Sequence, residues 1–286
     1  MNNINELKYS NNGAKLIIII FFLSYIVLFY SSSLNLIKIN KNYPKKKNII
    51  NKKSKLNLTH FISYSQCLED LILYCIFYDI DKGFYIDVGA NDPNKISVTK
   101  AFYLKGWNGI NVEPLPDMFP KLMQYRSRDI NLNMATGDKE DNLKLYVKGT
   151  GSTFNKQFSH NEKQMNIEVH TMSNICKKHI PKNQDIEFCK IDVEGFEKNV
   201  LLGYDFINYR PKVFCIESTF PGTFKPSYHE WEYILLKNGY NFGFQYIINR
   251  YYFDSNIDYL SDRFSNLNNY ILTYKQIHKK YKKKHK

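Results

Sequence analysis

Residues 84–113 read FYIDVGANDPNKISVTKAFYLKGWNGINVE, and this stretch decides the fold. It starts with an apolar strand that runs into a turn of small residues, Val88-Gly89-Ala90-Asn91. A helical segment at 97–106 follows, and a second apolar strand ends at Glu113. Two buried strands joined by a crossover helix form a βαβ unit, in which the strands are parallel. The stretch therefore predicts an α/β fold.

The same alternation continues on both sides of this unit. Upstream, residues 64–80 carry apolar side chains at helical spacing, with Glu69 and Asp70 near the expected positive end. Downstream, the pattern predicts strands at 130–135, 187–192, 212–218, 242–246 and 249–254, and helices at 115–125, 196–203 and 229–239. Residues 143–171 between them read as a β-hairpin or loop insertion. We therefore predict one domain over 59–274, with a mostly parallel sheet and helices on both faces.

The formal net charge of +13 is concentrated outside this domain. Residues 38–55 contain eight lysines and no acid, and residues 275–286 contain seven lysines and no acid. The region between them is slightly acidic, so a nucleic-acid partner is not expected. We interpret residues 38–58 as a basic linker and residues 275–286 as a basic C-terminal tail.

An apolar run begins at Leu16 and extends, through three serines, to Ile37. Its length suits one helix across a bilayer, so we predict a transmembrane helix at 16–37 after a short tail at 1–15. A cleaved signal peptide is the alternative. More lysines follow the run than precede it, which favours a single-pass membrane protein with its domain on the cytoplasmic side. The basic linker also suits contact with anionic membrane lipid.

The carboxyl ends of the first two strands predict a cofactor site, because ligands of doubly wound folds bind there. Gly89 allows a ligand to approach the backbone closely. The carboxylate of Glu113, at the end of the second strand, can accept hydrogen bonds from both hydroxyls of a ribose. A dinucleotide site would require the pattern G-x-G-x-x-G, and only Gly89 is present. An adenosine-type cofactor without phosphates fits better, and an ordinary strand-to-helix turn is the other interpretation of this segment.

Residues 190–195, KIDVEG, place charged side chains at the end of a later strand. Strand alternation puts Lys190, Asp192 and Glu194 on one side. Like charges in a cleft are costly unless they bind, orient or abstract protons, although a structural salt-bridge set is the alternative. Asp192 and Glu194 are candidate general bases, and His229 is a third candidate. The five cysteines show no zinc spacing. A divalent metal could also hold Asp192, but no complete ligand set is visible, so no metal site is predicted.

Taken together, these motifs resemble those of FkbM-type methyltransferases. SQxxED, DVGANDP, SVTKAFY, GWxGINVEP, RDINLN, STF, KIDVEG and NRYY occur in that family's order over about residues 61–255. The resemblance implies a Rossmann-like class I methyltransferase fold with a seven-stranded sheet, and S-adenosylmethionine (SAM) as the cofactor. It also implies roles for site residues: Asp87, Gly89 and Asn91 on the methionine and ribose side, Glu113 on the ribose, and Ala135, Thr136 and Asp138 near the adenine.

The resemblance also implies an activity, O-methylation of a hydroxyl on a carbohydrate or glycolipid, here at a membrane. SAM already carries the activated methyl group, so the protein must mainly hold the acceptor oxygen in line with it. A sugar hydroxyl is a poor nucleophile at neutral pH, and a general base such as Asp192 or Glu194 therefore helps. The alternatives are a nicotinamide-dependent oxidoreductase and a catalytically inactive, membrane-tethered binding module.

Overall fold

A computed structural model describes residues 56–159 and 162–284, which fall within one compact unit, Ser54–Lys286. The predicted N-terminal tail at 1–15, the transmembrane helix at 16–37 and most of the linker at 38–58 lie outside the described residues. Within the described part, no helix is both long and apolar enough to cross a membrane. The membrane anchor therefore stays a prediction.

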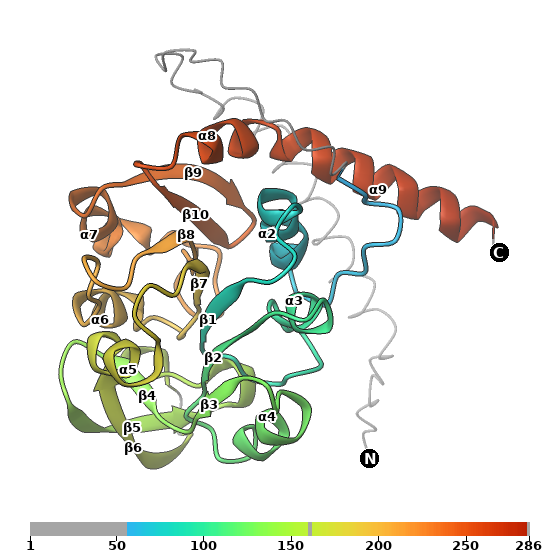
Figure 1. The fold of residues 1–286 in the computed structure, drawn as a ribbon. Helices are drawn as coiled ribbons and strands as arrows, with labels where there is room; N and C mark the ends of the chain where they lie inside the picture. Colours follow the sequence, from blue (N-terminus) through green and yellow to red (C-terminus); the bar gives the residue numbers. More distant parts are fainter. Residues whose placement is uncertain (1–55, 160–161, 285–286) are drawn as a thin grey trace, which may run out of the picture. The chain divides into compact units, whose positions relative to one another are not determined.

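Seven strands form the main sheet, in the order β3-β2-β1-β7-β8-β10-β9 (Figure 1). They are β1 (Phe84–Val88), β2 (Asn108–Val112), β3 (Ile130–Leu132), β7 (Ile186–Ile191), β8 (Pro211–Glu217), β9 (Tyr240–Tyr246) and β10 (Asn249–Asp254). All neighbouring pairs from β3 to β8 are parallel, whereas β10 is antiparallel to both β8 and β9. This confirms the predicted mostly parallel sheet. The strand order reverses between β1 and β7, and such a switch point is where ligands bind in open α/β sheets.

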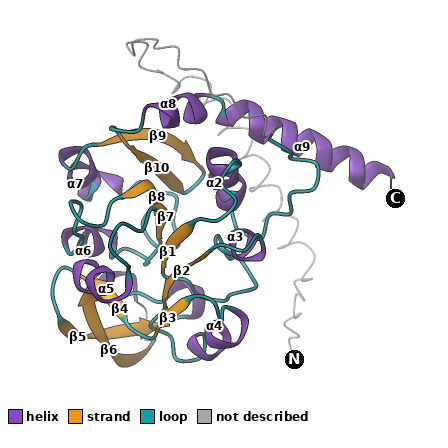
Figure 2. Ribbon diagram, viewed as in Figure 1, coloured by secondary structure: helices purple, strands orange, loops and turns teal. Residues whose placement is uncertain are grey.

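Helices cover both faces of this sheet (Figure 2), as the alternation predicted. One face carries α2 (Glu69–Phe77), α3 (Lys100–Leu104), α8 (Asp258–Ser265) and α9 (Leu267–Lys284), and the other carries α5 (Met172–His179), α6 (Glu197–Leu202) and α7 (Glu232–Lys237). Strand β8 has buried apolar side chains on both faces of the sheet. Val213 and Cys215 belong to one core and Phe214 and Ile216 to the other, because successive side chains of a strand point to opposite faces.

A second sheet of three strands follows β3, in the order β4-β6-β5. It consists of β4 (Ala135–Gly137), β5 (Asp141–Val147) and β6 (Lys163–Thr171), and the antiparallel pairing of β5 with β6 confirms the predicted hairpin. The expected strand at 130–135 is divided, since β3 ends at Leu132. The Asn133 amide then donates to the backbone oxygens of Glu113 and Pro114. Ala135 therefore belongs to the second sheet and not to the third strand of the main one.

The lysine-rich C-terminus differs from the expected tail at 275–286. Helix α9 continues through Lys284, and Leu267, Ile271 and Tyr274 are buried in the core beside α2. Apolar residues at this helical spacing form a stripe that packs on the domain, and packing stabilises the helix into the basic segment. The basic residues thus extend a docked helix as far as Lys284 and do not form a separate tail there.

Candidate active site

The turn after β1 lies against the chain that leaves β7. Gly89 has a φ of +78°, and a Cβ at this position would lie 1.9 Å from the carbonyl oxygen of Asp192. The Asp192 N–H in turn donates to the Val88 carbonyl at 3.0 Å. A glycine is therefore required at position 89 because these two loops approach each other closely. The sequence predicted a glycine there for a different reason, the close approach of a ligand to the backbone.

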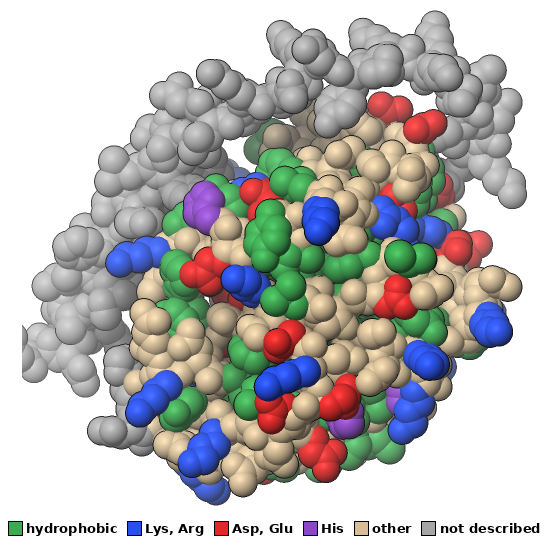
Figure 3. All heavy atoms as spheres, turned by 90° about the vertical axis from the view of Figure 1, so that its left-hand side faces the viewer, with side chains coloured by type: hydrophobic (Ala, Val, Ile, Leu, Met, Phe, Trp, Pro, Cys, Tyr) green, Lys and Arg blue, Asp and Glu red, His purple; other side chains and the backbone are tan. Residues whose placement is uncertain are grey.

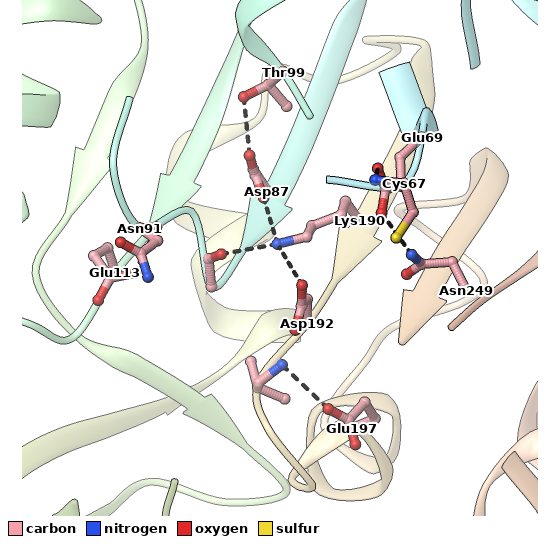
Figure 4. A network of polar contacts seen from close by, with 12 residues as sticks. Cys67, Glu69, Asp87, Asn91, Thr99, Glu113, Lys190, Asp192, Glu197 and Asn249 are labelled. Atoms are coloured by element: carbon pink, nitrogen blue, oxygen red, sulfur yellow. Dashed lines mark hydrogen bonds and ion pairs between the residues drawn. The ribbon is translucent and has the colours of Figure 1, made fainter. Parts of the chain in front are cut away.

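Lys190 connects the same two loops (Figure 4). Its Nζ donates to the carbonyl oxygen of Gly89 at 2.9 Å and lies 3.5 Å from Asp87 Oδ1 and 3.4 Å from Asp192 Oδ2. The Lys190 side chain is only 9% exposed. Burial alone would lower the pKa of Lys190, but the charges of Asp192 and Asp87 outweigh it and raise that pKa. The sequence prediction that Lys190 and Asp192 share one side is confirmed by this ion pair.

Asp87 faces the interior of the domain. It is 1% exposed, and its Oδ2 accepts a hydrogen bond from the Thr99 hydroxyl at 2.9 Å, at the start of α3. Together with the Lys190 contact, this places the carboxylate beneath the turn after β1. Asp87 thus supports the turn in this structure, and its expected contact with the methionine part of SAM stays a prediction.

Glu113 holds the turn after β1 against the end of β2. Its Oε2 accepts the Asn91 N–H at 2.7 Å and its Oε1 accepts the Leu115 N–H at 2.8 Å, and the residue is 3% exposed. Burial raises the pKa of Glu113 although both N–H groups favour its charged form. Each carboxylate oxygen has a second lone pair, so ribose binding remains compatible with these bonds and stays a prediction.

Three carboxylates form a group that we call the acidic cluster: Asp192, Glu194 and Glu217. One oxygen of each lies within 4.8 Å of the others. Glu217 is the last residue of β8 and is 7% exposed, and its Oε2 has no hydrogen-bond partner among the described residues. Sequence reasoning missed Glu217. The available signal was an acid that closes an otherwise apolar strand at the carboxyl edge of the sheet.

Burial and mutual repulsion make negative charge on the acidic cluster costly. Burial, followed by the charges of Asp192 and Glu197, raises the pKa of Glu194 to about 8. Burial and the neighbouring carboxylates raise the pKa of Glu217 to about 11. Glu197 accepts the N–H groups of Val193 and Gly195, each at 3.1 Å, yet burial still raises its pKa to about 7. These groups favour a positively charged or proton-donating ligand.

The residues expected near the adenine lie on or after β4. Ala135 and Thr136 are buried, and Ala135 packs in a small core with Leu115, two residues after Glu113. Asp138 is exposed and accepts a hydrogen bond from Asn199 Nδ2 at 3.0 Å. Ala135 is therefore near the end of β2, and the contact of these three residues with adenine stays a prediction.

His229 is not one of the residues whose ligand atoms gather in the acidic cluster of the described structure. It is exposed on the 3-10 turn η3 (Tyr228–Glu230), and its ring lies 3.9 Å from that of Tyr228. Trp231 is 1% exposed and belongs to the hydrophobic core. A nearby pocket is lined by Asn155, Gln157, Phe158, Gly195, Glu197, Lys198, Phe220, Ser227, Glu230 and Trp231.

Opposite charges are interspersed on the face of the domain shown in Figure 3. Lys and Arg side chains alternate there with Asp and Glu side chains and with neutral surface, and no continuous basic patch is visible on this face. Nucleic-acid binding usually requires such a patch. One face does not test the partner, and the absence of a nucleic-acid partner stays a prediction.

Comparison with known proteins adds to this geometry. No curated protein matches the chain significantly. A family model described as the methyltransferase FkbM domain matches residues 87–242, which is more than half of the chain. The match includes the turn after β1, the end of β2 and the whole acidic cluster. The chain belongs to the FkbM methyltransferase family.

Proposed function

We propose that this protein is a SAM-dependent O-methyltransferase that methylates a hydroxyl of a carbohydrate or glycolipid at a membrane. The observation that carries the proposal is the acidic cluster, which lies at the carboxyl ends of β7 and β8, next to the turn after β1. A hydroxyl acceptor needs a group that orients it and takes its proton, and carboxylates at this edge of the sheet can do both.

The cofactor side of the site is formed by the turn after β1 and the end of β2. Gly89, Asn91 and Glu113 lie together there, and the turn is fixed by the Asn91 N–H on Glu113. Asn91 and Asn94 stand where a dinucleotide fingerprint would have its second and third glycines. This disfavours a pyrophosphate and hence the nicotinamide-dependent alternative. A nucleoside sulfonium such as SAM has no phosphate to accommodate.

The acceptor side combines the acidic cluster with the pocket beside Gly195. Asp192 is accessible to an acceptor, with a side chain 32% exposed. Phe158 and Phe220, whose ring centroids are 5.7 Å apart, line the pocket and offer an apolar surface to a sugar ring. In the reaction, the acceptor oxygen forms a bond to the methyl carbon as the sulfur–carbon bond breaks. The hydroxyl proton passes to a carboxylate, and the products are S-adenosylhomocysteine and a methyl ether.

Calorimetry on the full chain in detergent tests the cofactor. We expect saturable binding of SAM and of S-adenosylhomocysteine, and none of NAD. Comparison of methylated glycans and glycolipids from cells with and without the protein tests the acceptor, and a methyl ether on a sugar should disappear in its absence. Tight binding of NAD without a response to SAM would refute the methyltransferase assignment at this site.

The side of the membrane has a separate test. Asn57-Leu58-Thr59 is a glycosylation sequon, and Asn57 is exposed. We propose the cytoplasmic side for the domain, because the lysines follow the apolar segment. In a eukaryotic host, Asn57 should then carry no sugar. A glycosidase-sensitive sugar at Asn57 would place the domain in the lumen.

A further inference from the structure

Full ionisation of the acidic cluster would place more negative charge there than its surroundings neutralise. Lys190 is the nearest cation with a defined contact, and it is already committed to the Gly89 carbonyl, Asp87 and Asp192. Among the described residues its ion pair with the cluster is to Asp192, whereas its charge and that of Lys148 act on Glu194 without an ion pair. Glu217 and Glu194 remain close to Asp192 in a partly buried setting, where like charges repel strongly.

Glu217 gives independent evidence for a ligand. The residue is 7% exposed, and its Oε2 has no hydrogen-bond partner among the residues that the structure describes, although a neutral Glu217 would share its proton with Asp192. A buried carboxylate oxygen without a partner costs free energy, and buried polar groups are nearly always satisfied by protein, water or an ion. The oxygen of Glu217 that belongs to the cluster lies within 4.8 Å of those of Asp192 and Glu194. The side chain is thus aimed at its two acidic neighbours.

We propose that Asp192, Glu194 and Glu217 bind one divalent cation of the oxygen-preferring class, such as Mg²⁺, Mn²⁺ or Ca²⁺. All three donors are carboxylates, the ligands that these hard ions prefer. Two ligands of one ion lie at most two bond lengths apart, about 4.2 Å for Mg²⁺ and about 4.6–5.2 Å for Ca²⁺. The three ligand atoms all lie within 4.8 Å of one another, which falls in the range for two ligands of Ca²⁺, and any pair farther apart than about 4.2 Å would have to close for Mg²⁺.

The cation deepens the proposed function, and its role in catalysis rests on that function. Three protein ligands leave coordination positions for water and for the acceptor hydroxyl. Coordination lowers the pKa of a bound hydroxyl and fixes its direction. Asp192 then acts as a ligand of the ion, and the acceptor oxygen is presented to the methyl group from the ends of β7 and β8.

Cation binding is tested without any turnover. The full chain, treated with a chelator and then dialysed, is titrated by calorimetry with MgCl₂, MnCl₂ and CaCl₂ in turn, and its thermal unfolding is followed with and without each salt. We expect one saturable site for at least one of these ions. At a free concentration of 100 times Kd, the ratio of folded to unfolded protein should rise about 100-fold.

Glu217→Gln keeps the shape of the side chain and removes its charge. It should weaken cation binding by at least about 10-fold, since even residues that merely support a ligand cost that much. In the cation-free protein it should not lower thermal stability, whereas loss of a purely structural salt-bridge residue would lower it. Glu168→Gln, an exposed carboxylate on β6, is the matched control and should leave cation affinity unchanged.

Glu194→Gln serves as a second variant with the same expectations. The proposal is overturned if none of the three ions binds saturably, or if both cluster variants bind the ion as tightly as the unchanged chain. SAM binding measured in chelator separates the two proposals. Intact SAM binding without a cation site would refute the cation alone, whereas a cation site without SAM binding would refute the assigned cofactor.

Discussion

Replacement of Glu113 distinguishes a residue that only binds the cofactor from one that also holds the site together. A carboxylate reserved for ribose could be changed with little effect on the fold. In this structure, however, both oxygens of Glu113 accept backbone N–H groups, from Asn91 and from Leu115. We therefore expect Glu113→Gln to lower stability and cofactor affinity together.

The magnitude follows from these two hydrogen bonds. Glutamine offers one acceptor oxygen, so one buried N–H would face the amide NH₂ group. Losing a hydrogen bond to a charged acceptor costs about 1.5–3 kcal/mol. Removing a buried charge, whose pKa burial has raised, offsets part of this cost. A net loss of about 2 kcal/mol corresponds to a Tm lower by about 4–8 °C for a domain of this size.

Thermal unfolding of the full chain, followed by circular dichroism, measures the first effect, and calorimetry with SAM measures the second. Glu168→Gln is the control, because this carboxylate on β6 is 75% exposed and is not one of the predicted cofactor residues. An unchanged Tm for Glu113→Gln would show that the two N–H bonds do not stabilise the turn. The structural role assigned to Glu113 would then be wrong.

Other changes test other parts of the site. A positive φ costs an alanine about 1 kcal/mol, and Gly89→Ala should destabilise the protein by several times this amount because its Cβ would meet the Asp192 carbonyl. Gly106, with φ of +93°, has no atom within 4 Å of the position of a Cβ, so Gly106→Ala should show only the smaller cost. Urea unfolding of the two variants measures the difference. Asp192→Asn should lower kcat about 10²- to 10⁴-fold with SAM affinity retained, and near-normal turnover would remove Asp192 from the chemistry. Burial alone would raise the pKa of Asp254, but hydrogen bonds from Arg210 at 2.6 and 2.9 Å help to hold it below its usual range. The Asp254 carboxylate should thus stabilise the fold fully above about pH 4 and lose this contribution as the pH falls through its lowered pKa. Asp254→Asn should therefore lower Tm far more at pH 7 than at pH 2.

Much of the fold could be predicted because its signals are local. Each strand and helix has its own pattern of apolar residues, and the order of these patterns implied parallel strands with helices on both faces. The break at Asn133 could not be predicted in this way. The strand pattern continues to Ala135, but the Asn133 amide bonds to the backbone of Glu113 and Pro114 and ends β3 early. That bond depends on the neighbouring strand and leaves no trace in the local pattern.

The acidic cluster likewise contains one feature that the local sequence predicted and one that depends on distant parts of the chain. Strand alternation along one segment was enough to place Lys190 and Asp192 on one side, and the ion pair confirms it. Glu217 could not be assigned, because an acid at the end of an apolar strand is common and its neighbours lie elsewhere in the chain.

The sequence by itself determined the α/β alternation, the small-residue turn at Gly89 and the carboxylates at strand ends, since these depend on residues close together in the chain. Only the tertiary structure decided which carboxylates meet. Parallel pairing of β7 with β8 in the register Ile191 to Ile216 brings the next residues, Asp192 and Glu217, to the same edge of the sheet. Register is fixed by packing both apolar faces of the strands at once, and a distant pairing of this kind cannot be obtained from local spacing.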